Sequence, residues 1–392
     1  MIPITKPYLD FQEEASVLEV LRSGWLTQGP KVTQFEEKFA QYLNAGYAVA
    51  VSSCTTALFL ALKCLNIGRG DDVIVPSYSF IATANAVAHT GATPVFADID
   101  GHSYNISVDS IAKVIRSGYT LNSKKELINN ATSNRLKAIM PVHQVGLPAD
   151  MDSILALAGK YGLCVVEDAA CAVGSGYKGR KIGGQTHMAC FSFHPRKIIT
   201  TGEGGMVTTG SKEYAQIIRS LRQHCMTVPD RARHESKRVI FESYPGIGYN
   251  FRMSDLQAAV GISQMSKIED ILKKRSEIAG IYNNEFVNHP YLETSEVAKG
   301  YGHTYQSYII KVKKGSPVSR DEIMSRLLNK DVATRRGIMA IHKEPAYRSF
   351  KNIIGLPITE ECAETTLIIP LYPQMTESEI KYVITELKEC FK

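Results

Sequence analysis

Short apolar segments alternate with amphipathic helical segments between Tyr47 and Thr209. Apolar strands that alternate with helices are typical of a largely parallel sheet with helices on both faces. The expected strands are Tyr47–Ser52, Asp72–Pro76, Pro94–Asp98, Ala138–Val142, Leu163–Glu167, Cys190–Phe193 and Met206–Thr209. The expected helices are Val32–Leu43, Thr55–Leu65, Thr83–Thr90 and Met151–Tyr161. This pattern predicts an α/β domain with a mostly parallel sheet.

The chain has 392 residues, which is too long for one compact core and predicts two domains. Met253–Phe286 has the pattern of a long helix and is expected to bridge them. Beyond it the expected elements are a strand at His303–Val312 and helices at Arg320–Leu328 and Glu377–Phe391. We therefore predict a large domain over residues 1–250 and a smaller α+β domain over residues 251–392.

Three segments lack a clear apolar period. Residues 1–30 are expected to form an arm of short elements, with Trp25 on or beside a loop marked by glycine and proline. Ser117–Arg135 is expected to be a surface insertion, and Arg219–Tyr249 a loop. A single tryptophan in such a place is more often a core anchor than a ligand contact.

Composition limits the class of protein. The formal charge of +6 is spread along the chain without a basic run, which argues against nucleic-acid binding but favours a phosphorylated substrate. No apolar run is long enough to span a bilayer, and the start MIPITKPYLD lacks the pattern of a signal peptide. The eight cysteines form no CxxC pair, so we expect reduced thiols, no metal site and a cytoplasmic location.

The stretch Phe191–Thr209 places Lys197 between an apolar segment and a Gly-rich turn, and Asp168 ends the preceding predicted strand. A buried acid and a lysine suit pyridoxal 5'-phosphate (PLP): the acid keeps the pyridine nitrogen protonated, and the lysine forms the Schiff base. Burial is expected to lower the pKa of the lysine and so to supply a free amine. Taken alone, the two residues would more simply be a helix cap and a surface lysine.

Two further motifs follow predicted strands. The segment SSCTTA, at Ser52–Ala57, precedes a helix whose free N–H groups can bind a phosphate, although simple N-capping by Thr55 is the commoner role. Phe80 follows the strand Asp72–Pro76 and could stack on a flat ring, although a lone phenylalanine is more often core.

The order of motifs along nearly the whole chain resembles the DegT/DnrJ/EryC1/StrS family of PLP-dependent nucleotide-sugar aminotransferases. The motifs are SSCTTAL, PSYSFIATANAV, PVFADID, VHQVGLPADMD, VEDAACAVGS, FSFHPRKIITTGEGG, GYNFRMSDLQAAVG and RRGIMAIHKEPAYR. Each motif is weak by itself, but their joint order and spacing are specific.

The resemblance implies the type I aminotransferase fold and a homodimer with shared active sites. It makes Lys197 the Schiff-base lysine, Asp168 the partner of the pyridine nitrogen, and Phe80 the stacking residue. The residues that match phosphate contacts are Thr55, Thr56, Ser192 and, donated by the partner subunit, Asn250. The residues expected to meet substrate are Trp25, His342, Arg335 and Arg336, with a solvated basic pair as the alternative for the two arginines.

Cys171 departs from the family pattern, because many relatives carry glutamine or another hydrogen-bonding residue there, near the phenolic oxygen of the cofactor. A thiol is a poor substitute, so we expect backbone, water or another side chain to make that contact.

The resemblance implies transfer of an amino group from glutamate to C4 of a nucleotide-linked 4-keto-6-deoxyhexose, in deoxyamino-sugar biosynthesis such as that of lipopolysaccharide O-antigen. The alternatives are amination at C3, a PLP-dependent sugar dehydratase of the same fold and a PLP-binding regulator without turnover. The dehydratase branch carries histidine at the position of Lys197, whereas His194 lies three residues earlier.

Overall fold

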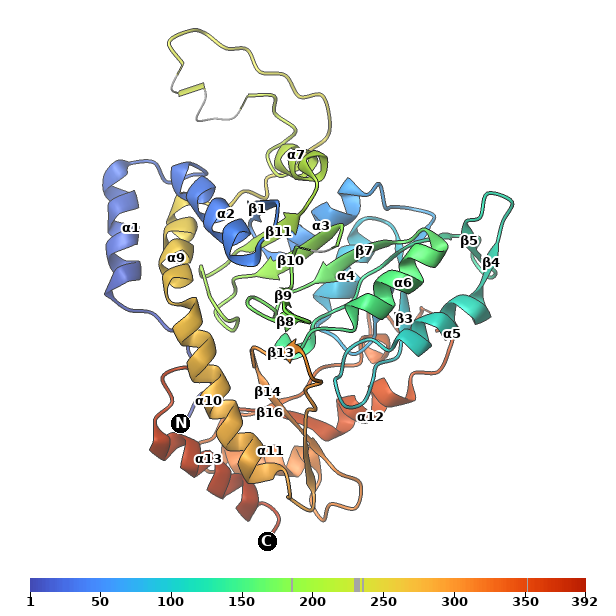
Figure 1. The fold of residues 1–392 in the computed structure, drawn as a ribbon, viewed down its shortest axis with the longest axis vertical. Coiled ribbons are helices and arrows are strands. Elements are labelled where there is room, and N and C mark those ends of the chain that lie inside the picture. The colour runs from blue at the N-terminus through green and yellow to red at the C-terminus, as the bar shows by residue number, and fades with distance from the viewer. Residues whose placement is uncertain (185, 229–232, 235, 351) are drawn as a thin grey trace.

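The computed structural model describes residues 1–184, 186–228, 233–234, 236–350 and 352–392 (Figure 1). At the centre of this part of the chain is a nine-stranded sheet whose main path is β1-β11-β10-β7-β6-β2-β3. These strands are β1 Tyr47–Val51, β2 Asp71–Pro76, β3 Thr93–Ala97, β6 Arg135–Ile139, β7 Cys164–Asp168, β10 Met188–Ser192 and β11 Gly205–Thr209. Neighbouring strands are parallel except at β11, which runs antiparallel to β1 and β10. The predicted mostly parallel sheet is confirmed.

Helices cover both faces of this sheet. Ala48 and Ala50 of β1 belong to the core on one face, and Val49 and Val51 to the core on the other, because successive strand residues point to opposite sides. The helices of this region are α1 Phe11–Ser23, α2 Pro30–Leu43, α3 Cys54–Cys64, α4 Ala82–His89, α5 Val108–Gly118, α6 Met151–Tyr161, α7 Lys212–Leu221 and α9 Asp255–Ser266. Residues from α2, α5, α6 and α9 pack into the first core, and residues from α3, α4 and α7 into the second.

Two of the segments without a clear apolar period contain regular elements. The arm at residues 1–30 contains the thirteen-residue helix α1, which begins with a capping box between Asp10 and Glu13. Ser117–Arg135 contains a hairpin of β4 (Tyr119–Leu121) and β5 (Leu127–Asn129) that pairs with β6. Its polar sequence concealed this, because its side chains bind a buried acid: Asn129 and the Tyr119 hydroxyl both donate to Asp72 at 2.7 Å.

The C-terminal part of the chain builds a second, four-stranded antiparallel sheet in the order β12-β14-β16-β15. Its elements are α10 Ile268–Phe286, β12 Leu292–Thr294, β14 Tyr308–Val312, α11 Arg320–Leu328, β15 Arg335–Arg336, α12 Pro357–Thr365, β16 Thr366–Ile369 and α13 Glu377–Glu389. The long helix predicted at Met253–Phe286 is present as two consecutive helices, α9 and α10. The predicted strand at His303–Val312 is shorter, because Tyr305 has a φ of 48° that no strand allows.

A separate hydrophobic cluster joins α10, α11 and α13 to β14 and β16, whereas α9 packs against α1 and α2. The predicted domain boundary at residue 250 stays a prediction. The predicted loop at Arg219–Tyr249 begins inside α7, and its residues 229–232 and 235 lie outside the described residues.

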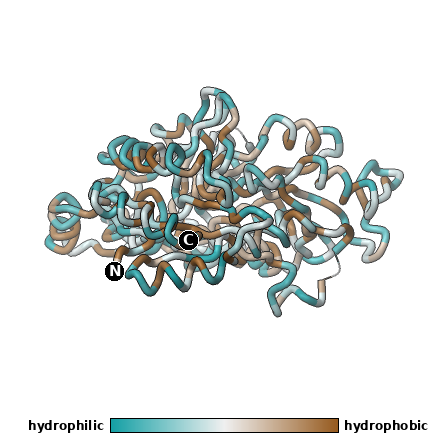
Figure 2. Tube along the Cα trace, turned by 90° about the horizontal axis from the view of Figure 1, so that it is seen from below, coloured by the Kyte–Doolittle hydropathy of each residue, from teal (hydrophilic) through white to brown (hydrophobic). Residues whose placement is uncertain are grey.

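The first residues of the chain lie with this C-terminal region. Ile2 donates its backbone N–H to Asp331 at 2.7 Å, and Leu371 donates to Ile4 at 3.2 Å. Figure 2, seen from below, accordingly shows both termini at the same end of the molecule. In the described part of the chain, the helices all fall short of the length and apolarity needed to cross a bilayer.

Candidate active site

The predicted cofactor residues gather at one edge of the central sheet. Asp168 ends β7, Ser192 ends β10, Phe80 follows β2, and α3 begins just after β1. Lys197 lies in the connection from β10 to β11. Ligands of open α/β sheets bind at the carboxyl ends of the parallel strands, so this edge is the expected place for a site.

Asp168 is a buried carboxylate, 4% exposed, with two hydrogen-bond donors. The Thr83 hydroxyl donates to Oδ2 at 2.7 Å, and the Ala170 N–H donates to Oδ1 at 3.2 Å. Burial raises the pKa of Asp168 above its ordinary value, although these donors and the charge of Lys197 oppose the shift. A carboxylate held in this way is suited to pair with a cationic nitrogen.

Sequence reasoning missed two residues that support Asp168. Thr83 is fully buried at the start of α4, and nothing in its local sequence marks it. His143 follows β6 inside the VHQVGLPADMD motif, and its backbone N–H donates to the Asp168 carbonyl at 3.1 Å. Because the Ala149 N–H donates to its Nδ1, the ring proton lies on Nε2, which contacts Glu167 at 2.8 Å.

Lys197 directs its amine toward Cys171, with 3.3 Å between Nζ and Sγ. Burial lowers the pKa of Lys197, but Cys171, Cys54 and Asp168 raise it by more, so that the net pKa lies above the ordinary value. The expected lowering of the lysine pKa was therefore wrong for the protein alone. The reason is that the sequence could not show a cysteine side chain beside the amine.

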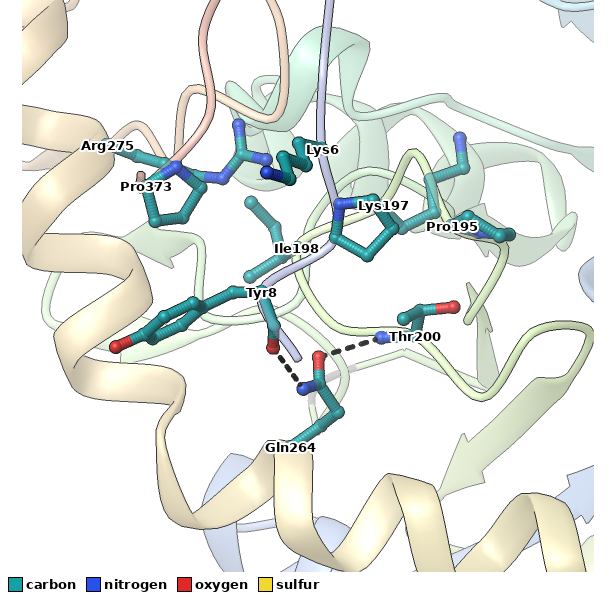
Figure 3. Close-up of a pocket in the computed structure, with 10 residues that line it drawn as sticks. Lys6, Tyr8, Pro195, Lys197, Ile198, Thr200, Gln264, Arg275 and Pro373 are labelled. Atoms are coloured by element: carbon teal, nitrogen blue, oxygen red, sulfur yellow. Dashed lines mark hydrogen bonds between the residues drawn. The ribbon is translucent and has the colours of Figure 1, made fainter. Parts of the chain in front are cut away.

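The loop that carries Lys197 is anchored on its other side, as Figure 3 shows. Gln264 of α9 accepts from the Thr200 N–H at 3.3 Å and donates to the Tyr8 carbonyl at 2.7 Å. Gln306 donates to the Arg196 carbonyl at 2.6 Å. The amine of Lys197 points away from this anchored side, so the loop presents a fixed lysine to the site.

A phosphate cradle forms where α3 meets β11. Ser53, and not Thr55, is the N-cap of α3, and its hydroxyl accepts from the Thr56 N–H at 3.2 Å. The hydroxyl of Thr56 is engaged in the same cap, because it donates to the Ser53 carbonyl at 2.8 Å. Within the described residues, the backbone N–H groups of Cys54 and Thr55 and the Thr55 hydroxyl have no partner, so they remain available to an anion.

Gly205 permits this close approach. A Cβ at Gly205 would lie 2.3 Å from the Ser53 carbonyl carbon and 2.6 Å from the Cys54 nitrogen. Ser192 pairs with Gly205 across β10 and β11 and therefore lies beside the same helix start. Sequence reasoning noticed the Gly-rich turn but not this packing reason for it.

These residues fit PLP. Phe80 is 66% exposed and not core, so a flat ring can cover it. Lys197, the buried Asp168 and the free N–H groups of α3 supply the amine, the counter-ion and the phosphate donors that such a cofactor requires. The donors for the phosphate and the ring lie on the same sheet edge, as one ligand demands.

The four predicted substrate residues differ in their surroundings. The side chain of His342 is 7% exposed, with Nδ1 2.7 Å from Ser77 Oγ and Nε2 3.2 Å from Glu360. Both ring nitrogens are thus engaged, and contact with substrate would require one of these bonds to break. The role of His342 stays a prediction.

The predicted basic pair, Arg335 and Arg336, forms β15. The two side chains point to opposite faces of the sheet, as those of adjacent strand residues do. Arg336 forms an ion pair with Glu344 at 3.3 Å. Burial and the charge of Arg335 lower the pKa of Arg196, the residue next to Lys197. In the described part of the chain, neither Arg196 nor Arg335 has a carboxylate within ion-pair distance.

Trp25 and Asn250 lie near the start of α9. Trp25 is half-buried on the predicted loop, and its Nε1 donates to the Gln28 carbonyl at 3.2 Å. The Gln28 side chain in turn donates to the Gln223 side chain, and the backbone of Gln223 forms an isolated β-bridge with Asn250. Asn250 is exposed, and the next residue, Phe251, accepts from the Ser52 N–H at 2.9 Å. Both Asn250 and Trp25 stay predictions as ligand contacts.

Comparison with known proteins covers the whole chain. The model of the DegT/DnrJ/EryC1/StrS aminotransferase family matches residues 7–388. The spore coat polysaccharide biosynthesis protein SpsC of Bacillus subtilis is 39% identical over 396 residues, covering 100% of this chain and 97% of that protein. The structure of the aminotransferase TlmJ from Streptoalloteichus hindustanus is 32% identical with a TM-score of 0.87, covering 100% of this chain and 98% of that chain. Helicobacter pylori PseC, an aminotransferase involved in the biosynthesis of pseudoaminic acid, is 27% identical with a TM-score of 0.88, covering 100% of this chain and 99% of that chain.

Proposed function

The chain belongs to the DegT/DnrJ/EryC1/StrS aminotransferase family, and from this premise we propose that it moves the amino group of glutamate to C4 of a nucleotide-linked 4-keto-6-deoxyhexose. It is a PLP-dependent sugar aminotransferase with the fold of that family. The observation that carries the proposal is the amine of Lys197 beside the buried Asp168 at the carboxyl edge of the sheet. The dehydratase and the regulator are set aside.

Each residue of the site has one proposed task. PLP, when bound, supplies an electron sink through its protonated ring. Asp168 keeps the ring nitrogen protonated, Phe80 covers one ring face, and the N–H groups at the start of α3 hold the phosphate together with Ser192. Lys197 Nζ holds the cofactor and, once released, moves a proton at the reacting carbon. Because one pocket serves glutamate and sugar in turn, the kinetics should be ping-pong.

A nucleoside diphosphate suits the positive charge near Lys197. Arg335 and Arg196 lack acidic partners in the described residues, and guanidinium groups match phosphate oxygens. Arg336 is the weaker candidate of the predicted pair, because Glu344 already neutralises it. A diphosphate between Arg335 and Arg196 would relieve their mutual repulsion.

The acceptor is tested by supplying enzyme, glutamate and 4-keto-6-deoxyglucose nucleotides and locating the new amine by NMR. We expect an amine at C4, with turnover falling strongly when the free sugar replaces the nucleotide sugar. An amine at C3 would support the alternative regiochemistry, and turnover of a non-nucleotide ketone would refute the acceptor class.

Arg335→Gln should raise KM for the nucleotide sugar at least about tenfold, as loss of a charge-assisted hydrogen bond predicts. Arg326→Gln, which removes an arginine already paired with Glu322, is the matched control.

We propose that the enzyme works as a homodimer. Val239, Phe241 and Ile247 are 83%, 90% and 90% exposed on a segment that extends beyond α7 in Figure 1. Apolar side chains this exposed are unusual on a monomer and favour burial against a second copy. Asn250 follows this segment, which supports its proposed contribution to the partner's site.

Mixing two inactive variants should restore activity if the sites are shared. A Lys197→Ala chain and an Asn250→Ala chain, allowed to exchange subunits, form hybrid dimers in which one site regains both native residues. Random exchange should restore about a quarter of the wild-type activity. The measurement is turnover before and after exchange, with each parent assayed alone as control. Confirmed exchange without recovery would mean that Asn250 serves the site of its own chain, where Phe251 meets Ser52.

We also propose a cytoplasmic location and a product destined for a surface polysaccharide such as O-antigen. All eight cysteines are free thiols, which suits a reducing compartment. The name of SpsC, a spore coat polysaccharide biosynthesis protein, supports the second point.

A further inference from the structure

Arg275 of α10 is a buried cation without an acidic partner among the described residues. It is 2% exposed, and burial lowers the pKa of its guanidinium to about 10, which still leaves it charged at neutral pH. Nη1 donates to the carbonyls of Tyr305, Gln306 and Leu371 at 3.1, 3.2 and 3.3 Å. Nε is buried and has no hydrogen-bond partner in the described part of the chain. The guanidinium therefore contacts carbonyl dipoles but no counter-ion.

Other arginines with little exposure are neutralised by acids. Arg222 is 5% exposed and forms an ion pair with Glu36 at 2.5 Å. The side chain of Arg320 is 11% exposed and also donates Nη1 to two backbone carbonyls, but its Nε pairs with Asp321. A buried charge is costly unless it is paired. Arg275 thus lacks the counter-ion that the fold provides for Arg222 and Arg320.

Arg275 also lines a small cavity behind the Lys197 loop. The basic side chains that line it are Lys6, Lys197 and Arg275, and none of the described lining residues is acidic. Figure 3 shows Lys6 and Arg275 on one side of the loop, whereas the amine of Lys197 points away from them. The cavity has space for about one particle of the size of a water molecule. Its charge therefore suits an anion, and its size excludes a phosphate or a carboxylate.

Two acids in this region are engaged elsewhere. Glu13 accepts from Gln264, a lining residue, but it forms an ion pair with Lys267 at 2.7 Å. Glu379 belongs to the capping box at the start of α13. Neither acid opposes the effect of burial on the pKa of Arg275. The charge of the guanidinium is thus left for a ligand to balance.

We propose that a monatomic anion, with chloride as the common representative, binds in this cavity as the counter-ion of Arg275. The Nε–H of Arg275 donates to the ion, and the exposed Lys6 adds to the attraction. Lys6 and Tyr8 belong to the N-terminal segment, and Thr200 belongs to the Lys197 loop, so the ion joins these segments to α10. The proposal does not depend on the identity of the sugar substrate or of the amino donor.

The test is a chloride titration of the holoenzyme at constant ionic strength, with gluconate, an anion too large for the cavity, as the replacement. An ion that binds the folded protein stabilises it, so Tm should rise with chloride and then saturate. Broadening of the NMR line of chloride measures the binding directly. Arg275→Gln should weaken chloride binding at least about tenfold, as loss of a charge-assisted hydrogen bond predicts.

Arg320→Gln is the matched control, because it removes an arginine that binds carbonyls in the same way but already has an acidic partner. It should keep the chloride response of the wild type. A wild type without a chloride response would overturn the proposal, and so would an undiminished response in Arg275→Gln.

If Arg275→Gln does not fold, crystals of the wild type grown in bromide decide the question. An anomalous peak beside Arg275 supports the proposal. Peaks confined to other parts of the protein, as adventitious ions give, reject it. Both results leave the assignment of Lys197 untouched, so the two proposals fail separately.

Discussion

Replacing Lys197 with alanine is expected to lower kcat at least about 10³-fold while the protein remains folded. The side chain supplies both the attacking amine and the proton carrier, and general acid–base groups alone contribute about 10²–10⁴-fold. Its described hydrogen bond is to Cys171, and the loop is held by backbone bonds to Gln264 and Gln306 that alanine leaves in place. Steady-state kinetics and circular dichroism measure the two parts of the expectation.

Lys113→Ala is the matched control, because Lys113 lies on the exposed face of α5 and should be dispensable. Borohydride treatment of the wild type followed by mass mapping should find the pyridoxyl adduct on Lys197. Retention of more than about a tenth of wild-type kcat in Lys197→Ala would be incompatible with both proposed tasks.

Replacing Asp168 with asparagine is expected to lower kcat at least about 10²-fold, with a smaller loss of PLP occupancy. Asparagine keeps the shape of the side chain and a hydrogen-bond acceptor for Thr83, but it removes the charge that keeps the ring nitrogen protonated. Losing one preorganised electrostatic partner of a reacting group costs about 10²–10³-fold in rate. Kinetics and the absorbance of bound cofactor measure the two quantities separately.

The same substitution should weaken the pH dependence of the stability of the cofactor-free protein. Burial raises the pKa of Asp168, so the stability that this group contributes is present at low pH and is lost as the pH rises through its folded-state pKa. Asparagine does not titrate, so the fall in Tm between low and neutral pH should be smaller in Asp168→Asn than in the wild type. Its amide has one acceptor oxygen, so it loses the bond from the Ala170 N–H at every pH, which shifts Tm without changing the slope of the profile. Asp152→Asn, at an exposed acid of α6, should change neither kcat nor this pH dependence. A wild-type pH profile of Tm together with near wild-type kcat in Asp168→Asn would reject both the electrostatic role and the account of its burial.

The sequence by itself determined the architecture of this protein. The strands β1, β2, β3, β7, β10 and β11 are buried on both faces, so their sequences are apolar runs. The order of the motifs identified the family, and with it Lys197 and Asp168 as candidates, because chemistry requires these residue types at the ends of particular strands. The hairpin of β4 and β5 was not recognised, since its stability comes from polar contacts with Asp72 and not from an apolar period.

Only the tertiary structure decided which side chains surround the candidate residues. Thr83 meets Asp168 across 85 positions of sequence, and Cys171 meets Lys197 across 26. It also separated Arg336, which binds Glu344, from Arg335, which lies near Arg196. Local periodicity determines which face of an element is buried, but it contains no information on what packs against that face. The pKa values and pairings of the site arise from those contacts, and the folded chain alone specifies them.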